Sequence, residues 1–211
     1  MLKSVSRFLI AFFLLSAILY RADAQKSAAD YWPMKAGSVW KFVTVSGGSK
    51  IYGTTKVIRV VKDAQGAIAT ITQTIGQNPG FTEKYRINKQ GIFRLGTGAN
   101  ASIRLDPPLP ILKSPFKIGD EWDWSGKMTM AGQENDAMGH VTVSGPETVR
   151  TPAGTFKAIK IHFLMTIDMS GQKMEIPTDY YLVAGVGMVR QTVQVGELAV
   201  DAKLVSMKLK K

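Results

Sequence analysis

The sequence predicts an all-β protein, a curved antiparallel sheet or half-open barrel. Hydrophobic and polar residues alternate with a period of two in several segments, as in a sheet with one face toward water. Clusters of glycine, proline, asparagine, aspartate and serine separate these segments and indicate hairpin turns. About nine such strands are too many for a flat sheet of this size, so twist favours a barrel, a half-barrel or two packed layers.

The first 24 residues have the three parts of a secretory signal peptide. Lys3 and Arg7 form a positive region, residues 8–20 are apolar or small, and residues 22–24 supply the small-x-small cleavage pattern. The apolar run has 13 residues, whereas a membrane-spanning helix needs roughly 20. We therefore expect cleavage after Ala24 and a periplasmic or secreted protein. The alternative is an uncleaved N-terminal anchor.

Residues 25–211 are expected to form a single β-rich domain. The sequence contains no cysteine, so neither a disulfide nor a lipid-modified cysteine can hold or anchor the exported chain. Its 187 residues are enough for a self-sufficient core, because a chain of about 150 residues already buries roughly 70% of its surface. The domain must therefore be stable through packing alone.

The net charge favours anionic partners. The full chain has 27 basic and 16 acidic residues, and removal of the signal peptide leaves 24 and 15, a net charge of +9. Such a charge attracts anionic surfaces at long range, so we expect peripheral contact with an anionic membrane surface. The basic residues are scattered and form no nucleic-acid recognition motif, so no nucleic acid is predicted as a partner. A merely solvated basic surface is the alternative.

Along the domain, the pattern predicts one short helical turn followed by strands. The turn spans Ser27–Trp32. A tight hairpin is expected at Thr151–Phe156, where proline presets the first turn position and Gly154 can adopt positive φ. It would join strands over Gly139–Arg150 and Phe156–Met169, and a last strand near Leu198–Leu209 completes the sheet. Other turns are predicted at residues 46–49, 63–66, 78–80 and 170–172.

Two stretches of the chain repeat in the same order. Pro33–Phe42 matches Pro115–Trp124, with proline, lysine, glycine and tryptophan in equivalent places, and an aromatic residue two positions later. Tyr85 and Tyr181 each precede a glycine by six residues. The repetition predicts two pseudo-repeats of about four strands each, at about residues 31–98 and 113–195. The proline-rich residues 106–110 would connect them outside any central strand. Alternatively, the similarity is no duplication, because any strand that follows a Pro-Gly turn can have this pattern.

Three motifs resemble a known group of proteins. They are Tyr31–Trp40, the Thr151–Phe156 hairpin, and the closing segment from Tyr180 through Val189. They are similar to exported bacterial β-rich proteins classified as a domain of unknown function. The resemblance covers most of residues 25–211 and implies a curved, half-open barrel like that of the LolA-type lipoprotein carriers, with an apolar groove. It carries over no functional residues. The sequence predicts no helix long enough to lie across such a groove.

Residues suited to catalysis are sparse. Neither His140 nor His162 lies near a nucleophile motif, and both are expected on the surface. The carboxylates of Asp120–Asp123 could serve a hydrolase of wall or glycan material, or simply lie on the wet face of a strand. Met128, Met130 and Met138 with His140 could hold Cu(I), although methionine is more often core. We predict no catalytic residue, no metal and no cofactor, and a non-enzymatic role is favoured.

Aromatic and methionine residues are the best candidates for binding. The predicted ligand-binding residues are Trp40, Phe42, Trp122, Trp124, Met165 and Met188. They are expected to share a pocket for a lipid-like ligand or, alternatively, to form a packed core. The sequence thus predicts an exported, non-catalytic binding protein, a carrier or chaperone for an apolar or amphipathic envelope ligand. The first alternative is a structural or assembly module that binds another envelope protein through a sheet edge.

Overall fold

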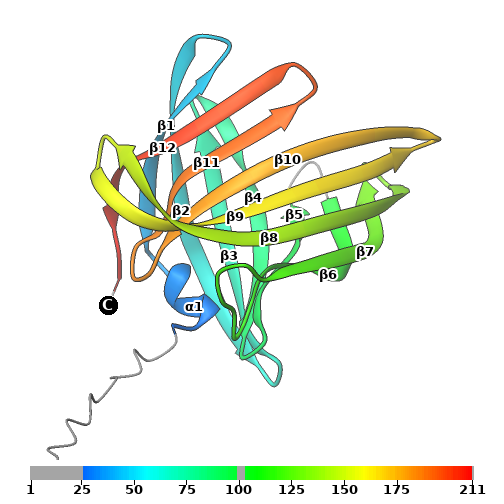
Figure 1. The fold of residues 1–211 in the computed structure, drawn as a ribbon, viewed down its shortest axis with the longest axis horizontal. Coiled ribbons are helices and arrows are strands. Elements are labelled where there is room, and N and C mark those ends of the chain that lie inside the picture. Colours follow the sequence, from blue (N-terminus) through cyan, green and yellow to red (C-terminus); the bar gives the residue numbers. More distant parts are fainter. Residues whose placement is uncertain (1–25, 99–102, 211) are drawn as a thin grey trace, which may run out of the picture.

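The chain forms a closed barrel of twelve antiparallel strands. The computed structural model describes residues 26–98 and 103–210, so the predicted signal peptide, residues 1–24, lies outside the described residues. Around the barrel the strands follow the order β1, β12, β11 and so on back to β2, so that neighbours in sequence are neighbours in space (Figure 1). The prediction of an antiparallel all-β fold is confirmed. The half-open form was wrong, because β1 pairs with β12 over eight residues and closes the ring.

The elements are one helical turn and strands of 8 to 19 residues. They are α1 Ala28–Tyr31, β1 Val39–Ser46, β2 Ser49–Asp63, β3 Gly66–Ile75, β4 Asn78–Asn88, β5 Gly91–Gly98, β6 Ile103–Lys113, β7 Glu121–Met130, β8 Gln133–Thr151, β9 Gly154–Met169, β10 Gln172–Val183, β11 Gly187–Val195 and β12 Leu198–Lys208.

Several predicted elements are confirmed. The helical turn is α1, and the last strand is β12. The hairpin between β8 and β9 has a two-residue turn, with Thr151 paired to Gly154. Gly154 has a φ of +136°, which L side chains rarely adopt. The period-two pattern of β9 also matches, because Ile161, Phe163 and other alternate residues are buried in the barrel.

Two local predictions were wrong. The turn expected at residues 78–80 lies two residues earlier, because β3 ends at Ile75, Gly76 takes the positive φ and β4 already begins at Asn78. The proline-rich residues 106–110 are not a connection outside the sheet but the middle of β6. The barrel has twelve strands rather than the expected nine or so. β6 was missed because its prolines argued against a strand.

The prolines fit in β6 because its second half has a strand neighbour on one side only. β6 pairs with β7 through Arg104, Leu105 and Asp106 alone, while its later residues pair with β5. The two strands part after the Asp106–Lys127 pair. At Gly126 the backbones are still so close that a Cβ would lie 2.5 Å from the Asp106 carbonyl oxygen. We call the diverging halves, Pro107–Lys113 and Glu121–Gly126, the β6–β7 seam. Proline is tolerated there for the reason that it is tolerated on edge strands.

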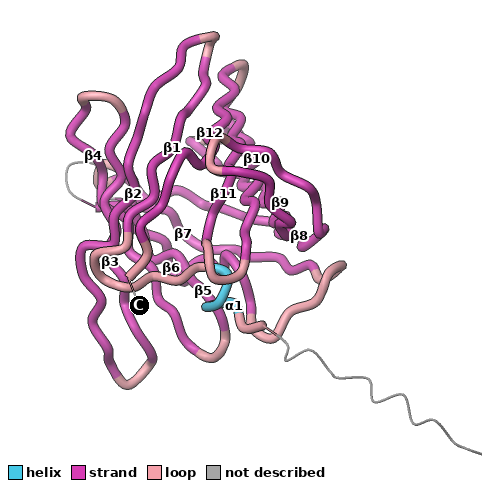
Figure 2. Tube along the Cα trace, turned by 90° about the vertical axis from the view of Figure 1, so that its left-hand side faces the viewer, coloured by secondary structure: helices cyan, strands magenta, loops and turns pink. Residues whose placement is uncertain are grey.

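One end of the barrel is closed by α1 and the residue that follows it. Trp32 is 7% exposed and packs on Tyr85 and Tyr180, with ring centroids 5.3 and 6.0 Å apart. The Gly185 N–H donates to the Asp30 carbonyl oxygen at 2.7 Å. Figure 2 shows the helix at this end, beside β5 and β11. The helical turn and Trp32 therefore cover this end of the barrel.

The duplicated motifs occupy corresponding strands, although repeats of four strands are too short for a barrel of twelve. The first motif pair starts β1 and β7, and the tyrosine pair lies in β4 and β10. Gly37 and Gly119 each donate a backbone hydrogen bond to a valine carbonyl oxygen, at 2.7 and 2.8 Å, and that valine donates back to the residue after the glycine. The duplication, predicted as two halves of about four strands each, stays a prediction.

Candidate functional site

The four predicted aromatic residues are all part of the packed interior. Trp40, Phe42, Trp122 and Trp124 are 3, 6, 8 and 6% exposed. The indole N–H of Trp40 donates to the Val186 carbonyl oxygen at 2.8 Å. Those of Trp122 and Trp124 cross the β6–β7 seam to β6 carbonyl oxygens, each at 3.1 Å. Each of the three indole rings is therefore buried, and its N–H donates a hydrogen bond to the protein.

Half of the predicted binding residues line one small interior cavity. Trp40, Phe42 and Met188 are neighbours around a cavity of about 20 Å³. This is about the space that one water molecule needs. Trp122 and Trp124 lie at the seam instead, and Met165 is buried in β9 at 7% exposure. Ligand binding by these six residues stays a prediction, and it requires the interior to rearrange.

The interior also contains a polar cluster that sequence reasoning missed. An Arg94 guanidinium N–H contacts the Glu83 carboxylate at 2.5 Å. The Tyr85 hydroxyl donates to the same carboxylate at 3.0 Å, and the Gln73 amide also donates to it. The available signal was the strand period, since Glu83 and Tyr85 share one face of β4.

Burial and charge explain the electrostatics of this cluster. Burial alone would lower the pKa of Arg94, but the adjacent Glu83 carboxylate holds it above its usual value. Burial raises the pKa of Tyr85 well above its usual value, and the Glu83 charge raises it further. Burial likewise raises the pKa of Tyr180. The phenols of Tyr85 and Tyr180 therefore stay protonated and neutral across the physiological range.

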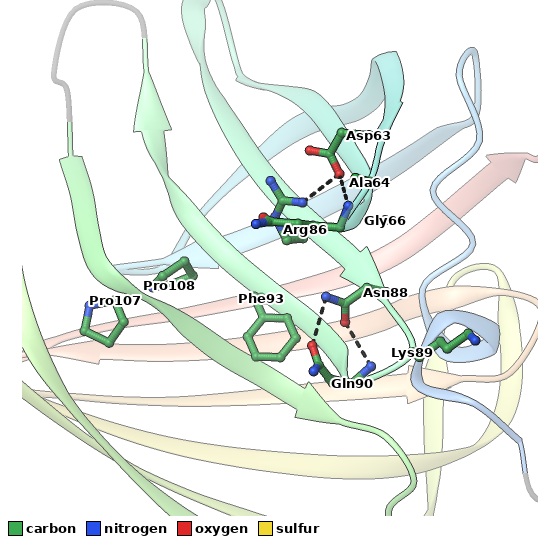
Figure 3. A pocket seen from close by; sticks show the side chains of 11 residues that line it. Asp63, Ala64, Gly66, Arg86, Asn88, Lys89, Gln90, Phe93, Pro107 and Pro108 are labelled. Carbon is green, nitrogen blue, oxygen red and sulfur yellow. Dashed lines mark hydrogen bonds and ion pairs between the residues drawn. The ribbon is translucent and has the colours of Figure 1, made fainter.

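A groove of about 1000 Å³ lies on the outside of the barrel. We call it the outer groove. The turn between β2 and β3, the turn between β4 and β5, and the middle of β6 surround it (Figure 3). Its lining consists of Asp63, Ala64, Gln65, Gly66, Arg86, Asn88, Lys89, Gln90, Phe93, Pro107 and Pro108. None of these was among the predicted binding residues.

The groove combines an apolar patch with ordered polar groups. Phe93 lies in its middle, with the two prolines on one side and the polar residues on the other (Figure 3). Asn88 accepts the Gln90 backbone N–H at 2.9 Å and donates to the Gln90 side chain at 3.2 Å. These local bonds hold both amides in place. Such a surface suits a molecule with both an apolar and a polar part.

The carboxylate in the groove is already paired. Arg86 contacts Asp63 at 2.9 Å, and the Gln65 backbone N–H donates to the same oxygen at 2.9 Å. The hydrogen bond from Arg86 lowers the pKa of Asp63 below its usual value. Asp63 is the single acidic residue among the eleven that line the groove. A two-carboxylate mechanism therefore has no second carboxylate there.

The carboxylates considered for hydrolysis lie on the outer wall instead. Glu121 and Asp123 are 70 and 86% exposed at their side chains. His140 Nδ1 lies 2.7 Å from Asp123, and its Nε2 lies 3.9 Å from Glu121. His162 is also on the outside, paired with Asp179 at 2.7 Å. Both histidines are therefore surface residues, as expected.

The methionines proposed for copper do not converge. Met128 points into the barrel at 5% exposure, whereas Met138 is 52% exposed on the outer wall. Across the described ranges, no group of three or more histidine, cysteine, aspartate or glutamate side chains is placed to hold a metal ion. In the same residues, no helix has the length and apolar character to cross a membrane.

One family model matches part of the chain, and solved bacterial structures have a similar fold. A family model described as DUF3108-like matches residues 110–193. A crystal structure of a candidate exported protein with a YmcC-like fold, from Bacteroides fragilis, is 15% identical with a TM-score of 0.52, covering 85% of this chain and 99% of that chain. A candidate lipoprotein from Parabacteroides distasonis is 15% identical with a TM-score of 0.51, covering 84% of this chain and 98% of that one. No curated protein matches.

These matches confirm the resemblance inferred from the motifs. The matched residues 110–193 include the Thr151–Phe156 hairpin and the segment from Tyr180 through Val189. At 15% identity, the structural likeness shows the fold alone. The LolA-like, half-open form is replaced by the closed barrel.

Proposed function

We propose that the protein is an exported, non-catalytic binding protein for an amphipathic molecule of the cell envelope, and that it binds this molecule in the outer groove. The apolar part would lie on Phe93, Pro107 and Pro108. The polar part would meet the amides of Asn88 and Gln90. The combination of an apolar patch with pre-ordered polar groups in one large groove is the observation that carries the proposal.

The state of the interior supports an outer site over an inner one. Burying apolar ligand surface contributes about 25 cal/mol per Å², but inside this barrel the ligand would first have to displace packed tryptophans. The cavity beside Trp40 has room for about one water molecule. The groove has about 1000 Å³, within the range of small-molecule sites.

An exported location is part of the proposal. The predicted signal peptide is the sequence argument for it, and the description of the Bacteroides protein as an exported candidate agrees with it. The net charge of +9 over residues 25–211 would bring the protein to anionic envelope surfaces. Export would place the proposed binding role outside the cytoplasm.

Octyl glucoside is a suitable probe, because it has one alkyl chain and one sugar head. We expect saturable binding of octyl glucoside monomers, measured by calorimetry below the micelle concentration. Phe93→Ala should weaken this binding about tenfold, equivalent to about 1.4 kcal/mol, through loss of apolar contact. Gln90→Ala should also weaken octyl glucoside binding, and it leaves the apolar patch unchanged. This second variant keeps the test valid if Phe93→Ala unfolds.

Tyr52→Ala is the matched control, since Tyr52 is an aromatic residue 67% exposed on β2 and outside the groove. It should bind the probe as the wild type does. Equal weakening by the control, or no effect of Phe93→Ala and Gln90→Ala in folded protein, would remove the groove as the site. Complete absence of binding would favour the alternative function, a module that binds another envelope protein.

A further inference from the structure

A second hollow lies at the end of the barrel that α1 closes. It has a volume of about 590 Å³ and shares no residue with the outer groove. We call it the α1-end hollow. It is lined by Lys26, Tyr31, Phe116, Lys117, Ile118, Pro146, Lys157, Ile159, Val183 and Ala184. These residues come from the start of the described chain, the loop between β6 and β7, and the ends of β8, β9 and β10.

The charged residues that line this hollow are all positive. Three of its ten lining residues are lysines and none is acidic. All three lysines are exposed. Lys157 also donates to the Thr148 hydroxyl at 2.7 Å, which orients its ammonium group on the outer wall. The nearby carboxylate of Asp30 is engaged by Ser27, whose backbone N–H donates to it at 2.7 Å. The Asp120 carboxylate also lies beside the hollow and accepts the Lys117 backbone N–H at 2.9 Å. Two carboxylates therefore flank the hollow, while its lining carries three positive charges and no negative one.

Apolar side chains lie between the lysines. Ile118 is 46% exposed although it is a large aliphatic residue. Tyr31 packs edge-to-face on Phe116, with ring centroids 5.3 Å apart, so two elements that are distant in sequence form one apolar patch. Figure 1 shows α1 beside the loop that carries Phe116 and Ile118. An exposed isoleucine next to aromatic rings can enter the boundary between lipid head groups and acyl chains.

We propose that the α1-end hollow docks the protein on the surface of an anionic phospholipid membrane. The three ammonium groups would pair with lipid phosphates, while Ile118 and Tyr31 contact the upper acyl chains. Charge complementarity selects this occupant over a neutral surface, because each basic residue near an anionic membrane strengthens binding about fivefold. The outer groove has a different lining, so docking is independent of the proposed ligand binding.

Vesicle flotation tests this docking. The protein, purified as the cell exports it, is mixed with vesicles of 70% phosphatidylcholine and 30% phosphatidylglycerol, or of phosphatidylcholine alone. We expect binding to the anionic vesicles only, weakened by 0.5 M salt because screening shortens charge attraction. The triple variant Lys26→Gln/Lys117→Gln/Lys157→Gln should bind roughly a hundredfold more weakly. Ile118→Ser should also weaken binding, at unchanged charge.

The control removes the same charge elsewhere. Lys50, Lys62 and Lys173 are exposed lysines outside the hollow, and their triple glutamine variant should keep most of the binding. Equal loss in both triple variants would show a general charge effect and overturn the proposal. Competition by 10 mM inorganic phosphate that abolishes vesicle binding would show a free-phosphate site, which also contradicts docking on a lipid surface. Octyl glucoside binding should be unchanged in every lysine variant.

Discussion

At the residue scale, the ion pair between buried Glu83 and Arg94, whose side chain is 24% exposed, has the largest predicted effect on stability. Glu83 is 4% exposed and accepts contacts from Arg94, Tyr85 and Gln73. Arg94→Met would leave this carboxylate charge buried without its counter-ion. Removal of one partner of a buried ion pair costs about 3–5 kcal/mol, so we expect a loss of about 3 kcal/mol in the free energy of unfolding, measured with urea.

The double variant distinguishes the pair from simple loss of packing. In Glu83→Gln/Arg94→Met, both charges are gone, so the protein should be more stable than the sum of the two single losses implies. A strictly additive double-mutant cycle would mean that the two side chains do not stabilise each other.

The buried tyrosines predict how stability depends on alkaline pH. Burial raises the pKa of Tyr85 and Tyr180 in the folded state, so the unfolded chain loses these protons first, near its ordinary pKa of 10.0. Their contribution to stability is present below that pH and is lost as the pH rises through the folded-state pKa. Tyr180→Phe should therefore reduce the loss of unfolding free energy between pH 10 and 11, by up to about 1.4 kcal/mol.

Urea titrations at pH 8, 10 and 11 measure this dependence for the wild type and Tyr180→Phe. Identical slopes in the two proteins would contradict a neutral, buried phenol at this position.

At the element scale, the β6–β7 seam is the weakest junction of the barrel. Three residue pairs join the two strands, against eight between β1 and β12. Two indole N–H groups, from Trp122 and Trp124, bridge the rest. Trp122→Phe and Trp124→Phe should each cost about 1–3 kcal/mol, because a buried carbonyl oxygen loses its donor. Hydrogen exchange in β6 and β7 should become faster.

Trp40→Phe is the control for this prediction. Trp40 also donates an indole hydrogen bond, but to Val186 at the other side of the barrel. Its loss should destabilise the protein without selectively accelerating exchange in β6 and β7. The same acceleration in all three variants would show that the seam is not a distinct junction.

The seam also shows where sequence reasoning could and could not reach. The period-two pattern predicted β9, and a Pro-Ala-Gly turn predicted the β8–β9 hairpin, because both signals are local. Proline avoids central strands, so residues 106–110 were predicted to lie outside the sheet. No local signal indicates that half of β6 pairs on one side only, as an edge strand does. Closure itself depends on β1 meeting β12, a contact between distant parts of the chain.

At the scale of the whole molecule, closure decides which surfaces can be functional. Trp40, Phe42, Trp122 and Trp124 are buried, as either a shared pocket or a packed core requires. The sequence could not give the free volume around them. The outer groove escaped prediction because its lining comes from two separate turns, the strand ends beside them and the middle of β6. Its amides and prolines, taken singly, are ordinary turn and loop residues. Their convergence is a property of the closed barrel.

The central claim is that the protein binds its ligand in the outer groove and not inside the barrel. The most direct test is a titration of isotopically labelled protein with octyl glucoside, followed by two-dimensional NMR. We predict that the backbone amides of Asn88, Gln90 and Phe93 shift, while the indole N–H signals of Trp40, Trp122 and Trp124 stay in place. Shifts of those indole signals, with the groove amides unchanged, would contradict the account and place the ligand in the interior.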